Sequence, residues 1–363
     1  MKAALYTGDS NSLAVTDVEL ALGTMGPHDV RIRVGATGVC HSDLSALRGT
    51  FGPLNNPSIM GHEGAGTVLA IGADVTRAAV GDRVITSFIP ACGDCFFCVR
   101  GQSNLCELNA QLRSAGVGRA TTSAGEAARA FCNLGTFAEE MIVHEASVVA
   151  VRTHLPDEQL ALVGCGVTTG VCAVFNTASV QPGETVAVIG CGGVGQAVIQ
   201  GARIAGAARI FAVDPVAFKR DTAKSLGATD GVDPSEGDPV EQLRAATAGR
   251  GVDYVFEVVG RPETAVEAHA AARLGGTVVL IGAGAPGERV SFDLFALHRE
   301  KRLLGCGYGS AQVRRDIPRL VTLAESGQLD LESMVTRRMP IEHVNEAFRL
   351  MTAGEVVRSV LSF

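Results

Sequence analysis

Short apolar runs separated by turn residues dominate the first 150 or so residues of the chain. Val30–Val34, Gly66–Ile71 and Arg83–Phe88 are such runs, and turn signals such as Gly81-Asp82 lie between them. Brief apolar segments bounded by glycine and aspartate are typical of β-strands joined by tight turns. The pattern predicts a compact, mostly-β domain in this part of the chain.

After about Leu160 the pattern changes to alternating strands and helices. Thr185–Ile189 is a continuous apolar run, as expected of a parallel strand buried on both faces. A glycine cluster and a helical pattern over Val194–Ala205 follow it. Further predicted strands and helices alternate at Ala208–Val213, Ala217–Leu226, Asp253–Val258, Thr264–Leu274 and Gly276–Gly282. This alternation predicts a doubly wound parallel sheet.

The last fifty residues are expected to form two helices, Ile317–Ser326 and Ile341–Thr352, and an apolar strand, Val356–Phe363. A chain of 363 residues is also too long for one ordinary hydrophobic core. We therefore expect an α/β protein of two domains. We expect residues 1–160 and 308–363 to belong to the mostly-β domain, and residues 161–307 to belong to the domain with the doubly wound sheet.

Composition excludes several classes of function. The net charge is −7 and no basic stripe is visible, so the electrostatic footprint of a nucleic-acid binder is absent. The first ten residues lack the apolar core of a signal peptide. The longest nearly apolar stretch, Ala161–Phe175, is short for a bilayer span and contains two threonines. We expect a cytoplasmic protein without a nucleic-acid or membrane partner.

Four of the ten cysteines lie close together, at positions 92, 95, 98 and 106. Cysteines that cluster in a cytosolic enzyme indicate metal binding or catalysis, because thiols there stay reduced. Four thiolates at this spacing can surround one tetrahedral zinc ion and leave no coordination position open. Cys92, Cys95, Cys98 and Cys106 thus predict a structural zinc site. A nucleic-acid-binding zinc ribbon is the alternative, but it usually has two CxxC knuckles, and no basic face accompanies this set.

The turn at residues 190–195 has the pattern of a dinucleotide-binding loop. Gly190, Gly192 and Gly195 match the three glycines of the fingerprint, and Gly193 adds a further one. The turn follows a predicted strand and opens a predicted helix, whose N-terminus attracts phosphate. Asp214, at the end of the next strand, is placed to bind both ribose hydroxyls and to repel a 2′-phosphate, which favours NAD over NADP. Lys219 either reaches the same ribose or is a solvated surface lysine.

A second possible metal site is dispersed along the chain. It combines Cys40 in GVCHSD, His62 and Glu63 in GHEG, and Cys165 in GCG. Two cysteines and one histidine with a fourth position open make a catalytic zinc set. Each residue alone has an ordinary explanation, since a lone buried cysteine is usually a small apolar side chain and a lone histidine is often part of the core.

These motifs together resemble the zinc-containing alcohol dehydrogenases of the medium-chain dehydrogenase/reductase superfamily, over essentially the full length of the chain. The resemblance rests on GVCHSD, GHEGAGTV, the four-cysteine lobe, GCGVTTG, VIGCGGVG with Asp214, and the closing GEVVRSVLSF. It implies a GroES-like catalytic domain, a Rossmann domain, two zinc ions per chain and hydride transfer between an alcohol and NAD.

The resemblance also implies roles for single residues. Cys40, His62 and Cys165 would bind the catalytic zinc, with Glu63 behind the metal and Asp43 holding the His62 ring. His41 and Arg358 would face the cofactor pyrophosphate. Thr169 and Val194 would position the nicotinamide, although ordinary helix packing also explains both residues. Phe88 would form an aromatic wall of the substrate pocket.

The proton relay departs from the family pattern at one position. Ser42 occupies the place of the hydroxyl that starts the relay, and many family members have a histidine three residues further on. This chain has Ser45 there, which cannot act as a base near neutral pH. Our hypothesis is that water or His41 completes the relay.

The substrate is expected to be a primary aliphatic or benzylic alcohol, or its aldehyde. The segment Asn109–Phe137 is expected to line the entrance, and its basic residues, Arg113, Arg119 and Arg129, do not indicate an anionic thiol adduct. A zinc ion lowers the pKa of an alcohol hydroxyl, and a hydride leaves carbon readily when its oxygen carries negative charge.

Two other functions stay open. The segments LVGCGVTTGVCAVFNTA and LGTFAEEMIVHEASVV resemble actinobacterial members, some of which hold the nicotinamide permanently and use an external electron acceptor. A non-enzymatic zinc protein that senses redox state is the other alternative, but sensing requires neither Ser42 nor Glu63. A homodimer is expected, with the apolar segment Leu303–Tyr308 as a candidate seam, unless that strand is internal.

Overall fold

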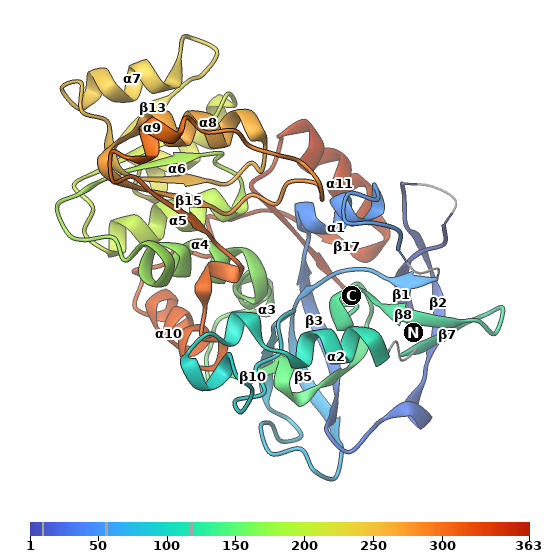
Figure 1. Cartoon of the computed structure of the whole chain (residues 1–363). Coiled ribbons are helices and arrows are strands. Elements are labelled where there is room, and N and C mark those ends of the chain that lie inside the picture. The colour runs from blue at the N-terminus through green and yellow to red at the C-terminus, as the bar shows by residue number, and fades with distance from the viewer. Residues whose placement is uncertain (9–10, 55–56, 116–118) are drawn as a thin grey trace. The chain divides into compact units, whose positions relative to one another are not determined.

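The computed structural model describes residues 1–8, 11–54, 57–115 and 119–363, which form two compact units (Figure 1). Unit 1 consists of Met1–Cys165, Gln312–Gly327 and Val335–Phe363, and unit 2 of Gly166–Ala311 and Gln328–Met334. From the sequence we predicted the domain boundaries after residues 160 and 307. The sequence pattern did not separate the short segment Gln328–Met334, where the chain returns to unit 2.

Unit 1 contains a small closed barrel and a larger sheet. The barrel has the strand order β1-β2-β7-β8-β4, with β1 (Lys2–Tyr6), β2 (Ala14–Leu20), β4 (Ser58–Ile59), β7 (Ala120–Thr122) and β8 (Ala127–Ala130). The larger sheet has the order β10-β6-β5-β3-β18-β17, and β9 also pairs with β3. Its strands are β3 (Asp29–Gly38), β5 (Glu63–Ile71), β6 (Arg83–Thr86), β9 (Glu140–His144), β10 (Val148–Ala150), β17 (Val335–Pro340) and β18 (Arg358–Ser362).

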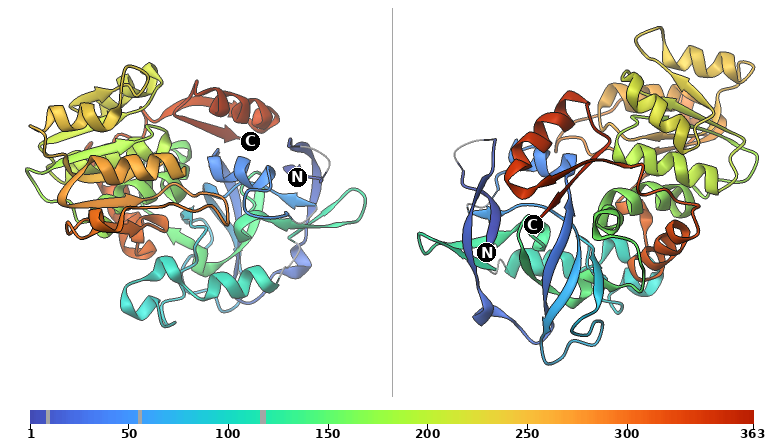
Figure 2. Two further views of the ribbon diagram at one scale, coloured as in Figure 1. Left: turned by 45° about the horizontal axis from the view of Figure 1, so that its top comes forward. Right: turned by 180° about the vertical axis from the view of Figure 1, so that it is seen from behind.

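Strand β3 shows why these residues form a sheet. Val30, Ile32 and Val34 are buried, whereas Arg31 and Arg33 between them are more exposed, as a period of two requires. β3 pairs with β5, β9 and β18, so the first and last parts of the chain share one sheet. Figure 2 shows this as blue and red ribbons within unit 1.

The helices of unit 1 connect and cover these strands. The α-helices are α1 (His41–Leu47), α2 (Leu108–Ala115), α3 (Asp157–Leu162), α10 (Val313–Glu325) and α11 (Val344–Ala353). Short 3₁₀ turns are η1 (Leu22–Thr24), η2 (Cys98–Arg100), η3 (Ser103–Leu105), η4 (Phe131–Asn133), η5 (Glu145–Ser147) and η9 (Ile341–His343).

Unit 2 is a parallel sheet with the strand order β13-β12-β11-β14-β15-β16. Its strands are β11 (Thr185–Ile189), β12 (Arg209–Val213), β13 (Asp230–Val232), β14 (Val252–Glu257), β15 (Ala272–Leu280) and β16 (Arg302–Gly305). Its helices are α4 (Thr168–Cys172), α5 (Gly193–Ile204), α6 (Ala217–Leu226), α7 (Pro239–Ala246), α8 (Pro262–Ala271) and α9 (Leu294–Leu297), with the 3₁₀ turn η8 (Tyr308–Ser310).

Alternate residues of β11 are buried against helices on opposite faces of the sheet. Val186 and Val188 pack in one core cluster with residues of α5, whereas Ala187 and Ile189 pack in another with residues of α7 and α8. The sheet is therefore covered on both faces, which explains its continuous apolar strands. The strand order reverses between β11 and β14, the switch point beside which ligands bind in such folds.

A helical run from Asp157 to Ala178 contains two π-helical segments, η6 (Val163–Val167) and η7 (Ala173–Ala178). Its 22 residues are long and apolar enough to cross a membrane, but 83% of its most apolar window is buried inside the protein, as in a core helix. The predicted helix Thr264–Leu274 ends earlier, at Ala271, and the predicted helix Ile341–Thr352 begins as the turn η9.

Candidate functional site

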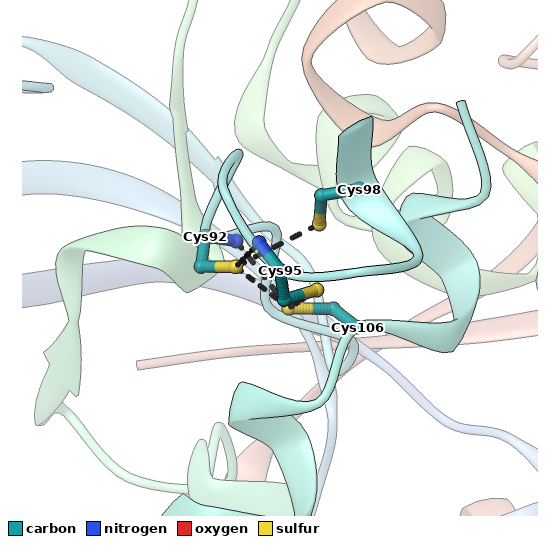
Figure 3. A group of neighbouring side chains, drawn as sticks. All are labelled: Cys92, Cys95, Cys98 and Cys106. Carbon is teal, nitrogen blue, oxygen red and sulfur yellow. Dashed lines mark hydrogen bonds between the residues drawn. The ribbon is translucent and has the colours of Figure 1, made fainter. Parts of the chain in front are cut away.

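The four clustered cysteines lie in one loop, with their sulfur atoms facing one another (Figure 3). The Sγ–Sγ distances are 3.5 Å from Cys92 to Cys106, 3.8 Å from Cys92 to Cys98 and 4.0 Å from Cys95 to Cys106. A tetrahedral zinc ion with bonds of roughly 2.3 Å to sulfur requires separations of about 3.8 Å. The four thiols therefore fit zinc, and they leave no coordination position for a substrate.

Two arginines attach this loop to the rest of unit 1. The guanidinium of Arg77 donates to the carbonyl oxygens of Ala91 and Cys92, at 2.7 and 2.6 Å. Arg314, at the start of α10, donates to the same two oxygens at 2.9 and 3.3 Å. Sequence reasoning missed both residues, because each acts on backbone atoms that have no signature in the sequence.

The dispersed metal-site residues come together in the interior of unit 1. The ligand atoms of Cys40, His62, Glu63 and Cys165 all lie within 4.8 Å of one another, and all four residues are buried. Two thiols and an imidazole at these separations match a zinc ion with an open fourth position. The carboxylate of Glu63 is the remaining candidate ligand.

Three elements position these ligands. Cys40 lies directly before α1 as its N-cap residue, and His62 and Glu63 lie where β5 begins. Cys165 lies in the π-helical segment η6, where the wider turn interrupts the α-helix. Such π-segments occur frequently at functional sites because they change the direction of a side chain within a helix.

Two glycines make room for this arrangement. A Cβ atom at Gly164 would lie 2.7 Å from the carbonyl oxygen of Thr86, so only glycine lets the helix approach β6 this closely. A Cβ atom at Gly38 would lie 2.1 Å from a carboxylate oxygen of Glu63. The close approach next to Cys165 thus depends on the glycine that precedes it.

Asp43 holds two of the ligands in place. Its carboxylate accepts a hydrogen bond from Nδ1 of His62 at 2.9 Å and from the backbone N–H of Cys40 at 3.2 Å. A proton on Nδ1 leaves the Nε2 lone pair of His62 for a metal. Burial alone would lower the pKa of His62, but the charges of Asp43 and Cys40 raise it well above its ordinary value.

Glu63 forms a buried ion pair with Arg358 of β18. Burial raises the pKa of Glu63 to about 7, although the Arg358 guanidinium opposes this rise. Arg358 is expected from the sequence to contact the cofactor pyrophosphate, and that contact stays a prediction. Its guanidinium lies against Glu63 inside unit 1, while its Nε atom has no hydrogen-bond partner in the described part of the chain. The pair joins residues 295 positions apart, so sequence reasoning missed it.

A pocket of about 540 Å³ in unit 1 reaches the open metal site. Ser42, His62 and Cys165 contribute to its wall, together with aromatic and charged residues. The rest of the described lining consists of Phe51, Pro53, Leu54, Ser58, Phe88, Arg113, Arg129, Ala130, Phe131, Cys132 and Asn133. The rings of Phe88 and Phe131 contact the His62 ring edge-on, with centroids 5.6 and 5.8 Å away. Ser42 and Phe88 therefore lie in one pocket with two predicted zinc ligands.

The glycine turn lies in unit 2, after β11. Gly190 has φ of +95°, and a Cβ atom at Gly195 would lie 1.9 Å from the carbonyl oxygen of Gly190, so both positions require glycine. A Cβ atom at Gly192 would meet nothing within 4 Å. α5 begins at Gly193 without a side-chain cap, which leaves its first N–H groups for a ligand phosphate.

Asp214 lies next to this turn, at the end of β12. Its carboxylate accepts hydrogen bonds from the backbone N–H groups of Cys191 at 2.8 Å and Val216 at 2.9 Å. Lys219 is half-buried in the first turn of α6. The carboxylate is thus held in position before any ribose binds.

Three residues expected at the cofactor occupy helix ends. Thr169 is buried in α4, and Val194 packs partly against the core of unit 2. These positions agree with ordinary helix packing and also with a role in positioning the nicotinamide. His41 is exposed at the first position of α1. Their contacts with a cofactor stay predictions.

Comparisons with known proteins agree with this arrangement. The profile of the alcohol dehydrogenase GroES-like domain matches residues 26–157, and that of the zinc-binding dehydrogenase domain matches residues 193–326. The S-(hydroxymethyl)glutathione dehydrogenase of Photobacterium damsela subsp. piscicida is 38% identical over 100% of this chain and 99% of its own length.

Solved structures are similar over the same length. An alcohol dehydrogenase zinc-binding domain protein from Burkholderia ambifaria has a TM-score of 0.93 at 32% identity, covering 100% of this chain and 98% of its own. The benzyl alcohol dehydrogenase of Acinetobacter calcoaceticus has a TM-score of 0.90 at 29% identity, with 100% and 99% covered.

The fold and the two candidate zinc sites together define a zinc-dependent dehydrogenase with a nucleotide-binding domain. The chain belongs to the zinc-dependent alcohol dehydrogenases of the medium-chain dehydrogenase/reductase superfamily. The predicted fold class, a GroES-like domain plus a Rossmann domain, is confirmed. So is the prediction of an oxidoreductase that uses zinc and a nicotinamide cofactor.

Proposed function

We propose that the protein oxidises primary aliphatic or benzylic alcohols to aldehydes with NAD, and that it catalyses the reverse reduction. The observation that carries this proposal is the open set of Cys40, His62 and Cys165 at a pocket with aromatic walls. Relatives named for S-(hydroxymethyl)glutathione and benzyl alcohol support a primary alcohol as the reacting group.

We assign each residue of the site one role in the proposed reaction. Zinc held by Cys40, His62 and Cys165 would act as a Lewis acid toward the substrate oxygen. Ser42, on the wall of the same pocket, takes up the hydroxyl proton and passes it on. Asp43 keeps the His62 ring in the tautomer that a metal requires. Phe88 limits the water that reaches the reacting carbon.

The preference for NAD rests on Asp214. Its carboxylate is buried and fixed by two backbone N–H groups, so it cannot turn away from an incoming ribose without losing both hydrogen bonds. A 2′-phosphate beside this fixed negative charge is repelled. Turnover with NADP is expected to be much slower than with NAD.

Turnover and metal content measured on one preparation test the proposal. The purified protein should contain two zinc ions per chain and form benzaldehyde from benzyl alcohol and NAD. Cys165→Ala should keep one zinc and lose more than about a hundredfold in kcat/KM, since even residues that only support a ligand contribute 10–100-fold. Cys172→Ala, another buried cysteine of the same helical run, is the matched control and should keep both zinc ions.

Three outcomes would contradict parts of this proposal. Full turnover by Cys165→Ala would show that the open metal site takes no part in the reaction. A wild-type protein with two zinc ions but no turnover would favour a non-enzymatic role. A reduced-nicotinamide absorbance band that survives gel filtration would indicate permanently bound cofactor.

We also propose that the protein is a cytoplasmic homodimer. Strand β16 is an edge strand of the unit 2 sheet, and exposed strand edges pair readily with a second copy. None of the ten cysteines forms a disulfide, which suits a reducing compartment. Light scattering on the same preparation should give twice the chain mass.

A further inference from the structure

A positive charge in unit 2 lies next to Asp214, the residue proposed to recognise the cofactor ribose. Arg220, in α6, donates a hydrogen bond from one guanidinium nitrogen to the backbone carbonyl oxygen of Asp214 at 2.6 Å. Another nitrogen of the same group contacts a carboxylate oxygen of Asp233 at 2.7 Å. Asp214 directly follows β12, and Asp233 directly follows the neighbouring strand β13. The guanidinium group thus joins α6 to the ends of two paired strands.

An arginine at this place would be expected to favour the other cofactor. In dinucleotide-binding folds an acidic residue binds the ribose hydroxyl of NAD, whereas a nearby arginine accommodates the 2′-phosphate of NADP. This chain has both kinds of residue in contact, Asp214 and Arg220. The choice of cofactor therefore depends on whether the charge of Arg220 is available to a phosphate.

Asp233 neutralises the charge of Arg220. The hydroxyl and the backbone N–H of Ser235 donate hydrogen bonds to the Asp233 carboxylate at 2.6 and 2.9 Å. These bonds lower the pKa of Asp233 below the ordinary 3.8, and Arg220 lowers it further, so the carboxyl group is ionised at neutral pH. The side chains of Arg220 and Asp233 are 15% and 13% exposed, so other atoms of the protein cover most of the ion pair.

The charge of Arg220 acts on the glycine turn. Burial raises the pKa of the Cys191 thiol in this turn, and the charge of Asp214 adds to the rise. The positive charges of Lys219 and Arg220 oppose this rise in pKa. The buried amide of Gln196 donates to the carbonyl oxygens of Cys191 and Lys219, both at 2.9 Å, and so fixes α6 against the turn. Arg220 therefore lies close enough to act on a charge that binds there.

We propose that Asp233 is a specificity-determining residue that excludes NADP by neutralising the arginine that would otherwise bind its 2′-phosphate. Selection of NAD then has two parts, because Asp214 repels the phosphate and Asp233 removes the attraction of Arg220. A guanidinium group binds phosphate through paired, charge-assisted hydrogen bonds, so its release from Asp233 should change affinity measurably. The proposal rests on the proposed function for the use of NAD, and not for the alcohol.

Binding of NADH and NADPH tests the role of Asp233 without any reaction. Each is titrated into the zinc-loaded protein without alcohol or aldehyde, and the fluorescence of the reduced nicotinamide reports binding. The wild type should bind NADPH much more weakly than NADH. Asp233→Asn keeps the shape and loses the charge, which leaves donors of Arg220 free. It should strengthen NADPH binding by about 10-fold, the usual effect of one hydrogen bond to a charged group, and change NADH binding little.

Variants of Arg220 should have the opposite effect on the choice of cofactor. Arg220→Gln leaves the charge of Asp233 unbalanced and should weaken NADPH binding more than NADH binding. A purely structural ion pair would instead make both single variants weaken both cofactors. The double variant Asp233→Asn/Arg220→Gln should lose the gain in NADPH affinity. Asp221→Asn removes an exposed carboxylate of α6 and is the matched control, which should keep the wild-type ratio of the two affinities.

Two results would overturn the role of Asp233. One is a wild-type ratio of NADPH to NADH affinity in Asp233→Asn with a native urea denaturation midpoint, or in Arg220→Gln if the first variant does not fold. The other is a gain in NADPH affinity that persists in the double variant. If no alcohol is oxidised but the affinities change as expected, the role of Asp233 stands and the proposed function fails. A wild type that binds neither cofactor would contradict both.

Discussion

Single carboxylates control the geometry of the open metal site. Asp43 contacts both the backbone of Cys40 and the ring of His62, so one side chain sets the position of one ligand and the tautomer of another. Glu63 contacts Arg358 and has one carboxylate oxygen without a partner in the described residues. We propose that this oxygen is the atom that approaches a metal during ligand exchange.

The two serines of α1 should differ in their effects on proton transfer. Ser42→Ala removes the hydroxyl in the pocket wall and should slow hydride transfer by about 10²–10⁴-fold, the usual contribution of a positioned proton-transfer group. Ser45→His adds a base near neutral pH and should change the pH dependence of the step with much less effect on its maximum rate. Single-turnover rates measured across a pH series would show this.

Ser42→Thr keeps a hydroxyl at the same position and is the matched control, since it should retain most of the rate. Equal effects of Ser42→Ala and Ser45→His on rate and pH profile would refute the assigned relay.

Site residues that lie close together in the sequence could be predicted, whereas contacts between residues far apart in the sequence could not. The four-cysteine set lies in one loop, so its spacing alone indicated a metal site. The glycine turn lies in one strand–helix connection, and its spacing together with the flanking strand and helix and with Asp214 indicated a dinucleotide site. Arg113, Arg119 and Arg129 are equivalent in the sequence. Only the fold distinguishes them, because it places Asp29 next to Arg119.

At the scale of elements, buried parallel strands were the easiest to predict. Thr185–Ile189 was predicted with its observed bounds, because apolar residues on both faces leave few alternatives to a central strand. The π-helical segment around Cys165 was not predicted, since no local pattern distinguishes it from an α-helix. Gly164 was the available signal, because a glycine inside a buried helix often marks a close approach.

Contact between α4 and α5 should be sensitive to one added methyl group. A Cβ atom at Gly170 would lie 2.6 Å from the Cβ of Ala197 and 2.6 Å from the carbonyl oxygen of Val194. Gly170→Ala should therefore lower the free energy of unfolding by about 1–3 kcal/mol through overpacking. It should also weaken NAD binding, because Val194 belongs to the glycine turn.

Urea titration measures the first effect and NAD titration the second. Gly23→Ala is the control, since a Cβ atom there meets nothing within 4 Å. The same denaturation midpoint for Gly170→Ala and wild type would show that the two helices can separate without cost.

At the scale of the whole molecule, buried carboxylates make stability depend on pH. Burial alone would raise the pKa of Glu145, but the backbone N–H of Thr76, together with His28 and Arg77, lowers it below the ordinary 4.5. A carboxyl with a lowered folded-state pKa stabilises the fold above its unfolded pKa and loses that contribution as pH falls through the folded value. This part of unit 1 should therefore weaken only below about pH 4.5.

Glu145→Gln should destabilise the protein by about 1–3 kcal/mol at neutral pH, because the charge-assisted hydrogen bonds are lost. The difference from wild type should shrink as the pH falls below 4.5. Urea denaturation over this pH range measures it, with the exposed Glu126→Gln as control. A difference that stays constant with pH would contradict the assignment.

The pairing of β3 with β18 also has a consequence for the order in which the protein is made. Cys165, the last of the three metal ligands to be made, leaves the ribosome about 190 residues before Arg358 does. At about 5–20 residues per second, this interval lasts roughly 10–40 s. During synthesis the three ligands thus exist while the carboxylate of Glu63 still lacks its guanidinium partner. The nascent chain offers a metal ion a more negative set of side chains than the finished protein does, so capture of the ion and closure of the sheet are separate events in time.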